Sequence, residues 1–125
     1  SRSVARAGMS LSQVARVLNA HGLIADAHYA GDHTPTSFRD LATRALSAEG
    51  EHVIVNYSRG ALGQTGAGHI SPLGAYDAES DRFLILDVSR YKAPSVWVAT
   101  EALFAAMAEP VSQGGRTRGF VLVRK

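Results

Sequence analysis

The residues of this chain best suited to do chemistry together are a histidine and an aspartate, His69 and Asp87, which lie 18 positions apart. Between them, Asp77 to Asp81 is a run of small and acidic residues typical of a hairpin turn. In such a hairpin the aspartate can accept a hydrogen bond from one imidazole nitrogen, and the other nitrogen can then act as a base toward a nucleophile. The pair could therefore supply the orienting residue and the base of a catalytic triad.

The length of the turn decides whether the two side chains meet, because successive residues of a strand face opposite sides of a sheet. A three-residue turn, Asp77 to Glu79, pairs Tyr76 with Ser80 and puts Asp87 directly opposite His69. A five-residue turn makes them diagonal neighbours, still within reach. A four-residue turn puts them on opposite faces and excludes the pair. The alternative, at this point, is a histidine and an aspartate that only cap strand ends.

Other reactive residues give weaker signals. Ser71 shares a strand face with His69 but lacks the sharp strand-to-helix elbow that exposes a hydrolase serine. The run Gly66-Ala67-Gly68 lacks the third glycine and the helix of a dinucleotide site, and no Gly-Lys-Ser/Thr follows the other glycines. The remaining histidines lack the ligand spacing of a zinc site, and we expect them at the surface: His21, His28, His33 and His52.

Length and composition limit the kind of protein that can carry this pair. With 125 residues, 46% of them hydrophobic, the chain is one domain or part of one and can fill a core. The net charge is only +2 and the basic residues are scattered, so the footprint of a nucleic-acid-binding protein is missing. Apolar runs such as Phe83 to Leu86 are far shorter than the ~20 residues that span a bilayer, and no signal peptide is visible.

The chain contains no cysteine. Disulfides, thiolate metal sites and a cysteine nucleophile are therefore excluded within these residues. This composition does not fix the compartment, although a cytoplasmic location is the one we favour.

The elements that must position His69 follow from the spacing of apolar residues. Ser10 and Gln13 form a capping box before a helix of about ten residues that starts at Leu11. Leu23 to Ala30 is predicted as a short strand, and Thr34-Pro35 begins a second helix that ends before Gly50.

Beyond His52 the apolar period changes to that of strands. Val53, Val55 and Tyr57 indicate one strand, and a glycine-containing loop from Ser58 to Gly68 follows it. The further predicted elements are strands at His69 to Tyr76, Arg82 to Val88 and Gly119 to Arg124, and a helix at Thr100 to Ala108. The predicted fold class is α+β, with two helices followed by a mostly antiparallel sheet and one further helix.

Several segments resemble the phytochelatin synthase family more specifically than any periodicity does. They are Tyr57-Ser58-Arg59-Gly60-Ala61, Gln64 to Gly74, and Ile85-Leu86-Asp87-Val88-Ser89-Arg90-Tyr91-Lys92. The similarity continues through Trp97-Val98, Leu103, Ala106-Met107 and Arg118 to Leu122, and extends more weakly back to Gly8. Nearly the whole chain resembles this family.

The resemblance implies a papain-like cysteine transpeptidase fold. Such enzymes remove glycine from glutathione through a γ-glutamylcysteinyl thioester and pass the acyl group to a second glutathione or to water. The family pattern makes His69 and Asp87 the triad histidine and aspartate. Arg118 matches an arginine that is expected to bind the free carboxylate of the acyl group, a task that suits a forked guanidinium.

Further site residues and partners come from the same resemblance. Arg90 is expected to bind substrate or to support the sheet, and Gly68 and Asn56 are expected to border the site. The protein itself would bind no metal. A heavy-metal ion such as cadmium or zinc would enter as its thiolate complex with glutathione.

One departure from the family is serious. The cysteine nucleophile and an oxyanion-hole glutamine belong to a helical segment more than 68 residues before the histidine, and only 68 residues precede His69. His69 and Asp87 alone supply neither a thiolate nor an oxyanion site. We therefore expect residues 1–125 to be the C-terminal portion of one catalytic domain. Its partner would be the N-terminal half or a second copy of the chain.

Two alternative functions stay open at this point. A hydrolase of the same fold would give γ-glutamylcysteine, because water rather than a second thiol peptide would reach the thioester. A binding module for a γ-glutamyl peptide or a metal thiolate would perform no chemistry. The missing cysteine favours the module, whereas the retained His69, Asp87 and Arg118 oppose it.

Overall fold

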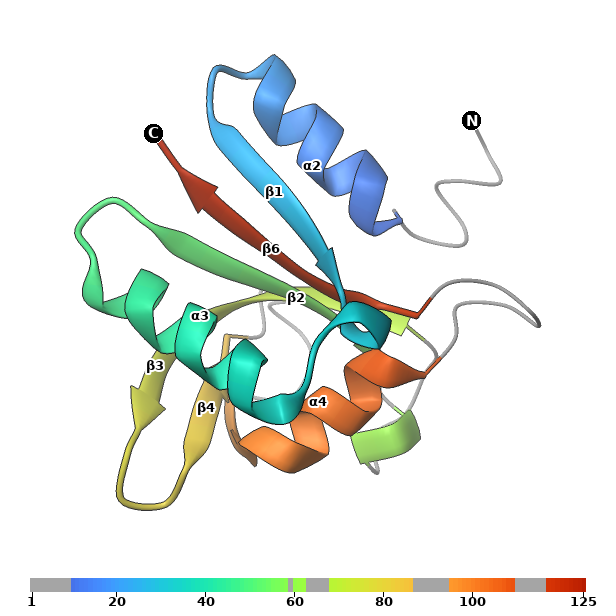
Figure 1. The fold of residues 1–125 in the computed structure, drawn as a ribbon, viewed down its shortest axis with the longest axis vertical. Coiled ribbons are helices and arrows are strands. Elements are labelled where there is room, and N and C mark those ends of the chain that lie inside the picture. The colour runs from blue at the N-terminus through green and yellow to red at the C-terminus, as the bar shows by residue number, and fades with distance from the viewer. Residues whose placement is uncertain (1–9, 59, 63–67, 87–94, 110–116) are drawn as a thin grey trace.

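The computed structural model describes residues 10–58, 60–62, 68–86, 95–109 and 117–125 (Figure 1). In this part of the chain six strands form one antiparallel sheet in the order β1-β6-β2-β3-β4-β5. The strands are β1 (Ile24–Tyr29), β2 (His52–Ser58), β3 (Gly68–Asp77), β4 (Arg82–Ile85), β5 (Val96–Ala99) and β6 (Gly119–Arg124). The helices are α2 (Leu11–Ala20), α3 (Pro35–Ser47) and α4 (Thr100–Ala108), with short 3₁₀ turns η1 (Ala30–Asp32) and η2 (Gly60–Leu62). The α+β class is confirmed.

The first two helices begin at the capping signals in the sequence. The Ser10 hydroxyl accepts the Gln13 backbone N–H at 3.2 Å, and the Gln13 side chain accepts the Ser10 N–H at 2.8 Å. Thr34 and Ser37 make the same reciprocal pair at the start of α3, with Pro35 in its first turn. Each box satisfies two backbone donors that a helix start would otherwise leave without partners. Among the described residues, no helix is both long and apolar enough to cross a membrane.

Helices cover the two faces of the sheet unequally. One face, which we call the α3/α4 face, packs Val53, Val55 and Tyr57 of β2 against α3 and α4. The opposite face, the α2 face, packs α2 against Ala25 of β1 and Val121 of β6. Figure 1 shows α3 and α4 lying together, while α2 lies along β1. The alternation along each strand therefore assigns its side chains to one of two cores.

Strand β5 was not predicted from the sequence. Its four residues run directly into α4 without an intervening turn, so no glycine or proline marks the end of the strand. Val96 and Val98 contribute to the α3/α4 core, while Trp97 faces away and is 46% exposed. Strand β4 ends at Ile85, and residues 87 and 88 of the predicted strand lie outside the described residues.

Candidate functional site

The hairpin that carries His69 has a four-residue turn, which is the one of the three lengths weighed from the sequence that would by itself separate His69 from position 87. Asp77 pairs with Arg82 and Tyr76 pairs with Phe83, which leaves residues 78–81 as the turn. Asp81 closes it with a positive φ of 54°, a conformation that aspartate tolerates better than most residues. On its own, this turn would put positions 69 and 87 on opposite faces.

A β-bulge in β3 reverses that outcome. Beyond Gly74 the register moves by one residue, so that Leu73 pairs with Ile85 and the Leu86 N–H donates to the Pro72 carbonyl at 3.0 Å. Leu73 and Tyr76 both pack into the α3/α4 core although they are three positions apart, an odd number that one extra residue in the strand explains. From the bulge toward His69, paired residues have numbers with an even sum, as Leu73 and Ile85 do. If this register continues, positions 69 and 87 share a face, as the triad hypothesis needs. Asp87 itself lies outside the described residues, as does Arg90.

Gly74 is the extra residue of this bulge, and its lack of a side chain matters. A Cβ atom built at Gly74 would lie 2.8 Å from Cδ2 and 2.9 Å from Cγ of Leu86. Real Cβ atoms essentially never approach so closely, so any larger residue would have to displace Leu86. The glycine allows Leu86 to lie over the bulge.

His69 lies at the start of β3, directly opposite Tyr57 of β2. The two rings meet edge to face, with centroids 5.9 Å apart and planes at 79°, and Tyr57 is only 3% exposed. The Nε2 atom of His69 is buried, while the residue as a whole is half-buried. A rigid aromatic neighbour therefore orients the imidazole at the edge of the α3/α4 core.

Ser71 follows His69 on the same face and is completely buried. Its hydroxyl makes no hydrogen bond within the part of the chain that the structure describes. Because it is enclosed by the core and sits mid-strand, it has none of the exposure that a nucleophilic serine needs.

Arg118 lies immediately before β6. Its backbone N–H and its Nη1 atom both donate to the Glu109 carbonyl, at 3.3 and 3.1 Å, and its own carbonyl accepts the Ala30 N–H at 2.9 Å. Gly119 pairs with Asn56, so one further step in register puts Arg118 beside Tyr57, and Tyr57 in turn pairs with His69. We call these three cross-strand neighbours, Arg118, Tyr57 and His69, the His69 row. Two strand spacings separate the backbones of Arg118 and His69, about 10 Å. These contacts anchor the arginine at the same end of the sheet as the histidine.

Asn56 and Gly68 lie next to this row but on the other side of the sheet. Asn56 is opposite Ile70 and belongs to the α2 face, where it is 6% exposed. Gly68 pairs with Ser58 and directly precedes His69. The structure brings His69 and Arg118 to one row, and it directs the Asn56 side chain away from it.

A second polar cluster was missed by the sequence analysis. His28 and His33, expected at the surface, are half-buried against Phe120, and the His28 ring stacks on the Phe120 ring at 5.0 Å. Nδ1 of His28 lies 3.1 Å from Nε2 of His33, and Nδ1 of His33 lies 3.0 Å from the Ser37 hydroxyl. Burial and the neighbouring His33 lower the pKa of His28, against an opposing effect of Asp26. The four residues between His28 and His33 fall within the His-x₃₋₅-His spacing of zinc fingers, but in zinc fingers that spacing accompanies a pair of cysteines, which this chain lacks.

Comparisons with known proteins agree with the resemblance carried by the sequence motifs. Residues 1–120 match the family model described as phytochelatin synthase. Glutathione gamma-glutamylcysteinyltransferase 3 of Lotus japonicus is 40% identical over 118 residues, which cover 94% of this chain and 25% of the relative. Glutathione gamma-glutamylcysteinyltransferase 1 of Arabidopsis thaliana is 38% identical over 94% of the chain and 24% of the relative. The Schizosaccharomyces pombe enzyme of that name is 31% identical over 93% and 28%. The chain thus spans about a quarter of the length of these curated relatives.

Proposed function

Because this chain belongs to the phytochelatin synthase family, we propose that the whole protein is a glutathione γ-glutamylcysteinyltransferase. The observation that carries the proposal is the similarity to transferases of that name over nearly the entire chain. The row that contains His69, Tyr57 and Arg118 supports it, because this row could hold and activate one extended substrate.

The proposed reaction proceeds in two acyl transfers. A cysteine thiolate attacks the carbonyl carbon of the Cys–Gly bond of glutathione, and His69 accepts the thiol proton and returns it to the departing glycine amine. The resulting thioester is then attacked by the amino group of a second glutathione, whose proton passes to His69 while the thiol is regenerated. Since this chain contains no cysteine, the proposal assigns the thiol to another part of the protein.

In this proposal Asp87 orients the imidazole of His69. The register beyond the Gly74 bulge supports that role, since it has the parity that would put the two side chains on one face. The edge-to-face contact with Tyr57 would hold the ring plane while the thiol approaches. Asp87 would also stabilise the imidazolium that forms in each transfer.

Arg118 would bind the free carboxylate of the γ-glutamyl group. An extended γ-glutamylcysteinyl unit spans about 9 Å from that carboxylate to the reacting carbonyl, by the usual reach of a residue plus two methylenes. This length is comparable with the ~10 Å between the backbones of Arg118 and His69 along the row. A guanidinium has five N–H donors in a fork, so it can hold the Glu109 carbonyl and a carboxylate together. Arg90 is proposed as a second substrate contact, with Gly68 at the border of the site; Asn56 is not included, because its side chain lies on the α2 face.

The finer assignments follow from the same proposal. The intact domain would have the papain-like arrangement, with the thiol on a helix and the histidine on the sheet. Its partners would be glutathione and the thiolate complex of glutathione with a heavy-metal ion such as cadmium or zinc, the metal entering as part of the substrate. The described chain would pack against an N-terminal half or a second copy.

The test uses the whole protein with glutathione, with and without Zn²⁺ or Cd²⁺, and mass spectrometry of the products. Glycine release with longer γ-glutamylcysteine peptides supports transfer, whereas γ-glutamylcysteine alone identifies a hydrolase. We expect His69→Ala to lower kcat by about 10²- to 10⁴-fold, and Arg118→Lys to raise KM about tenfold. His52→Ala, at an exposed site, is the matched control. No glycine release from the whole protein, or full activity in His69→Ala, would overturn the proposal.

A further inference from the structure

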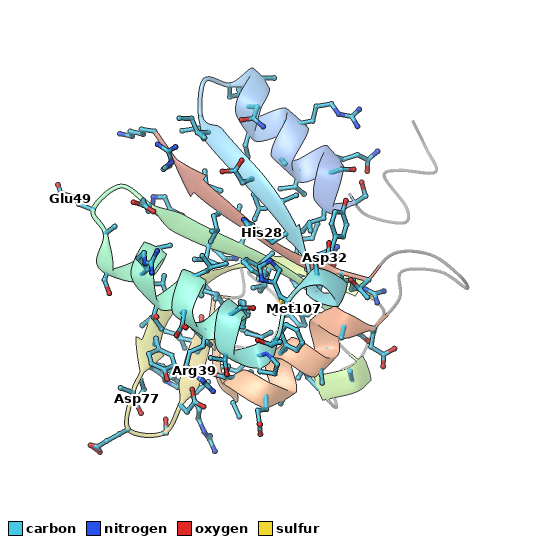
Figure 2. All side chains as sticks on the ribbon, in the orientation of Figure 1. His28, Asp32, Arg39, Glu49, Asp77 and Met107 are labelled. Carbon is cyan, nitrogen blue, oxygen red and sulfur yellow. The ribbon has the colours of Figure 1, made fainter. Side chains whose placement is uncertain are left out.

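His28 and His33 bring two imidazole nitrogens to one point at the edge of the α3/α4 core. His28 lies in β1, and the 3₁₀ turn η1 folds the chain back so that His33 meets it over Phe120. Figure 2 shows His28 where β1 approaches η1 and α3. Nδ1 of His28 and Nε2 of His33 are 3.1 Å apart. Both residues are half-buried, so each keeps part of its surface exposed to solvent.

The contacts around Ser37 favour one tautomer of His33. The Ser37 hydroxyl donates its one proton to the Thr34 carbonyl at 3.1 Å, and it accepts the Thr34 backbone N–H at 2.9 Å and the Thr34 hydroxyl at 3.4 Å. With the Ser37 proton directed at the carbonyl, the 3.0 Å contact between this hydroxyl and Nδ1 of His33 is donated by the imidazole. In this tautomer Nε2 of neutral His33 carries its lone pair and directs it toward Nδ1 of His28.

This arrangement is close to that of two ligands on one metal ion. Zinc binds imidazole nitrogen at about 2.0–2.1 Å in a tetrahedral geometry, which separates two such nitrogens by about 3.3 Å. The observed 3.1 Å is thus within about 0.2 Å of the distance for shared coordination. His28 needs only to move its proton from Nδ1 to Nε2, a change of tautomer that leaves the ring neutral.

Two further features favour a cation here. A metal-ligating histidine commonly donates its other N–H to a neighbouring acceptor, as His33 does to Ser37. Asp26, two residues before His28 on the same side of β1, exerts a negative field on the imidazole.

We propose that His28 and His33 form a two-histidine site for a borderline divalent transition metal ion, such as Zn²⁺, Ni²⁺ or Co²⁺. Imidazole ligands select these ions over Mg²⁺ and Ca²⁺, which prefer oxygen. Among the described residues no cluster of three histidine or acidic side chains is arranged around a common ion. In the proposed site, water or a small external ligand would fill the other coordination positions. This site is separate from the His69 row, and it stands whether or not the transferase proposal holds.

The experiment titrates Zn²⁺ and Co²⁺ into the chelator-treated whole protein and follows heat and visible absorption. We expect one equivalent to bind at the His28–His33 site. His28→Phe, which keeps a ring to stack on Phe120, and His33→Ala should each weaken binding at least tenfold. His21→Ala, at an exposed histidine of the same chain, is the matched control and should bind as the parent does.

A measurement on the unmodified chain guards against variants that fail to fold. In imidazole ¹⁵N spectra, added Zn²⁺ should shift Nδ1 of His28 and Nε2 of His33, while Mg²⁺ should shift neither. Ser37→Ala should reduce affinity about tenfold, because His33 loses the acceptor that fixes its tautomer. Equal affinity in His28→Phe and His33→Ala, or unchanged ¹⁵N signals at saturating Zn²⁺, would overturn the proposal and leave a simple hydrogen bond between the rings.

Discussion

The carboxylate of Asp81 joins the β3–β4 hairpin to both helices that pack on its face, and replacing it by asparagine should destabilise the protein. Its Oδ1 atom accepts hydrogen bonds from Arg39 Nε at 2.9 Å, and from the Tyr76 and Thr100 hydroxyls at 2.7 Å each. Its Oδ2 atom accepts Arg39 Nη2 at 2.8 Å. Figure 2 shows Arg39 on α3 extending toward the hairpin that bears Asp77. Asp81→Asn removes the charge without straining the backbone, because asparagine also tolerates the positive φ found at this position.

The size of the effect follows from the pKa of Asp81, which the hydrogen bonds from Arg39, Tyr76 and Thr100 lower from 3.8 to about 2. At about 1.4 kcal/mol per pKa unit, full protection would contribute roughly 2 kcal/mol. Because the side chain is 42% exposed, solvent screening reduces this to about 1 kcal/mol. A lowered carboxyl pKa stabilises the folded state above the unfolded value, and the contribution is lost as pH falls through the folded value.

Urea denaturation of the parent and of Asp81→Asn between pH 7 and pH 2 measures both parts of this prediction. We expect the variant to be about 1 kcal/mol less stable at pH 7, with the difference shrinking as pH falls from about 4 toward about 2. Asp40→Asn, at an exposed residue of α3, is the matched control. Equal stability of parent and Asp81→Asn at pH 7, or a difference that does not depend on pH, would refute the reasoning.

Three further predictions concern single residues. Gly74→Ala should push Leu86 away from the bulge, which should lower glycine release by the whole protein several-fold and destabilise it by about 1 kcal/mol. Gly31→Ala is the control: its added Cβ meets Thr117 at an ordinary 3.5 Å, so neither activity nor stability should change. Gly119→Ala should cost more than about 2 kcal/mol in urea denaturation, because its Cβ would fall 2.0 Å from the His28 carbonyl oxygen of the neighbouring strand; a stability equal to that of the parent would contradict the register of β1 and β6. Burial and the neighbouring His33 hold the pKa of His28 below its ordinary 6.5, so the stability of the folded protein decreases as pH falls below about 6.5. This slope should be smaller in His28→Phe than in the parent, and an unchanged slope would assign it to other groups.

Local signals were enough to predict most of the elements. The capping box at Ser10, the N-cap Thr34 followed by Pro35, and the apolar stripes predicted α2 and the start of α3. The segments predicted for α4 and β6 match the structure residue for residue. These features depend on neighbours within about four positions, which a sequence displays directly. The short edge strand β5 was missed because nothing in its own residues separates it from α4.

Long-range contacts account for what the sequence did not predict at the site. The turn has four residues because Asp81 is held by Arg39, 42 positions away, and by Thr100, 19 positions away. The His28–His33 contact depends on Phe120 from the last strand, so its burial could not be inferred from local spacing. His69 and Arg118, by contrast, were recognisable from family motifs, and the structure adds the row that they share.

The four-residue turn and the Gly74 bulge must be considered as one unit. The four-residue turn alone would put positions 69 and 87 on opposite faces of the sheet, and the bulge alone would do the same. When both are present, the two one-residue shifts cancel. If Gly74 were lost and the turn kept, positions 69 and 87 would face opposite sides; if the turn lost one residue and the bulge stayed, the same separation would result. The contacts of Asp81 with α3 and α4 fix the turn, and the position of Leu86 over Gly74 fixes the bulge. Geometry at the far end of the hairpin therefore determines whether His69 can share a face with its proposed partner.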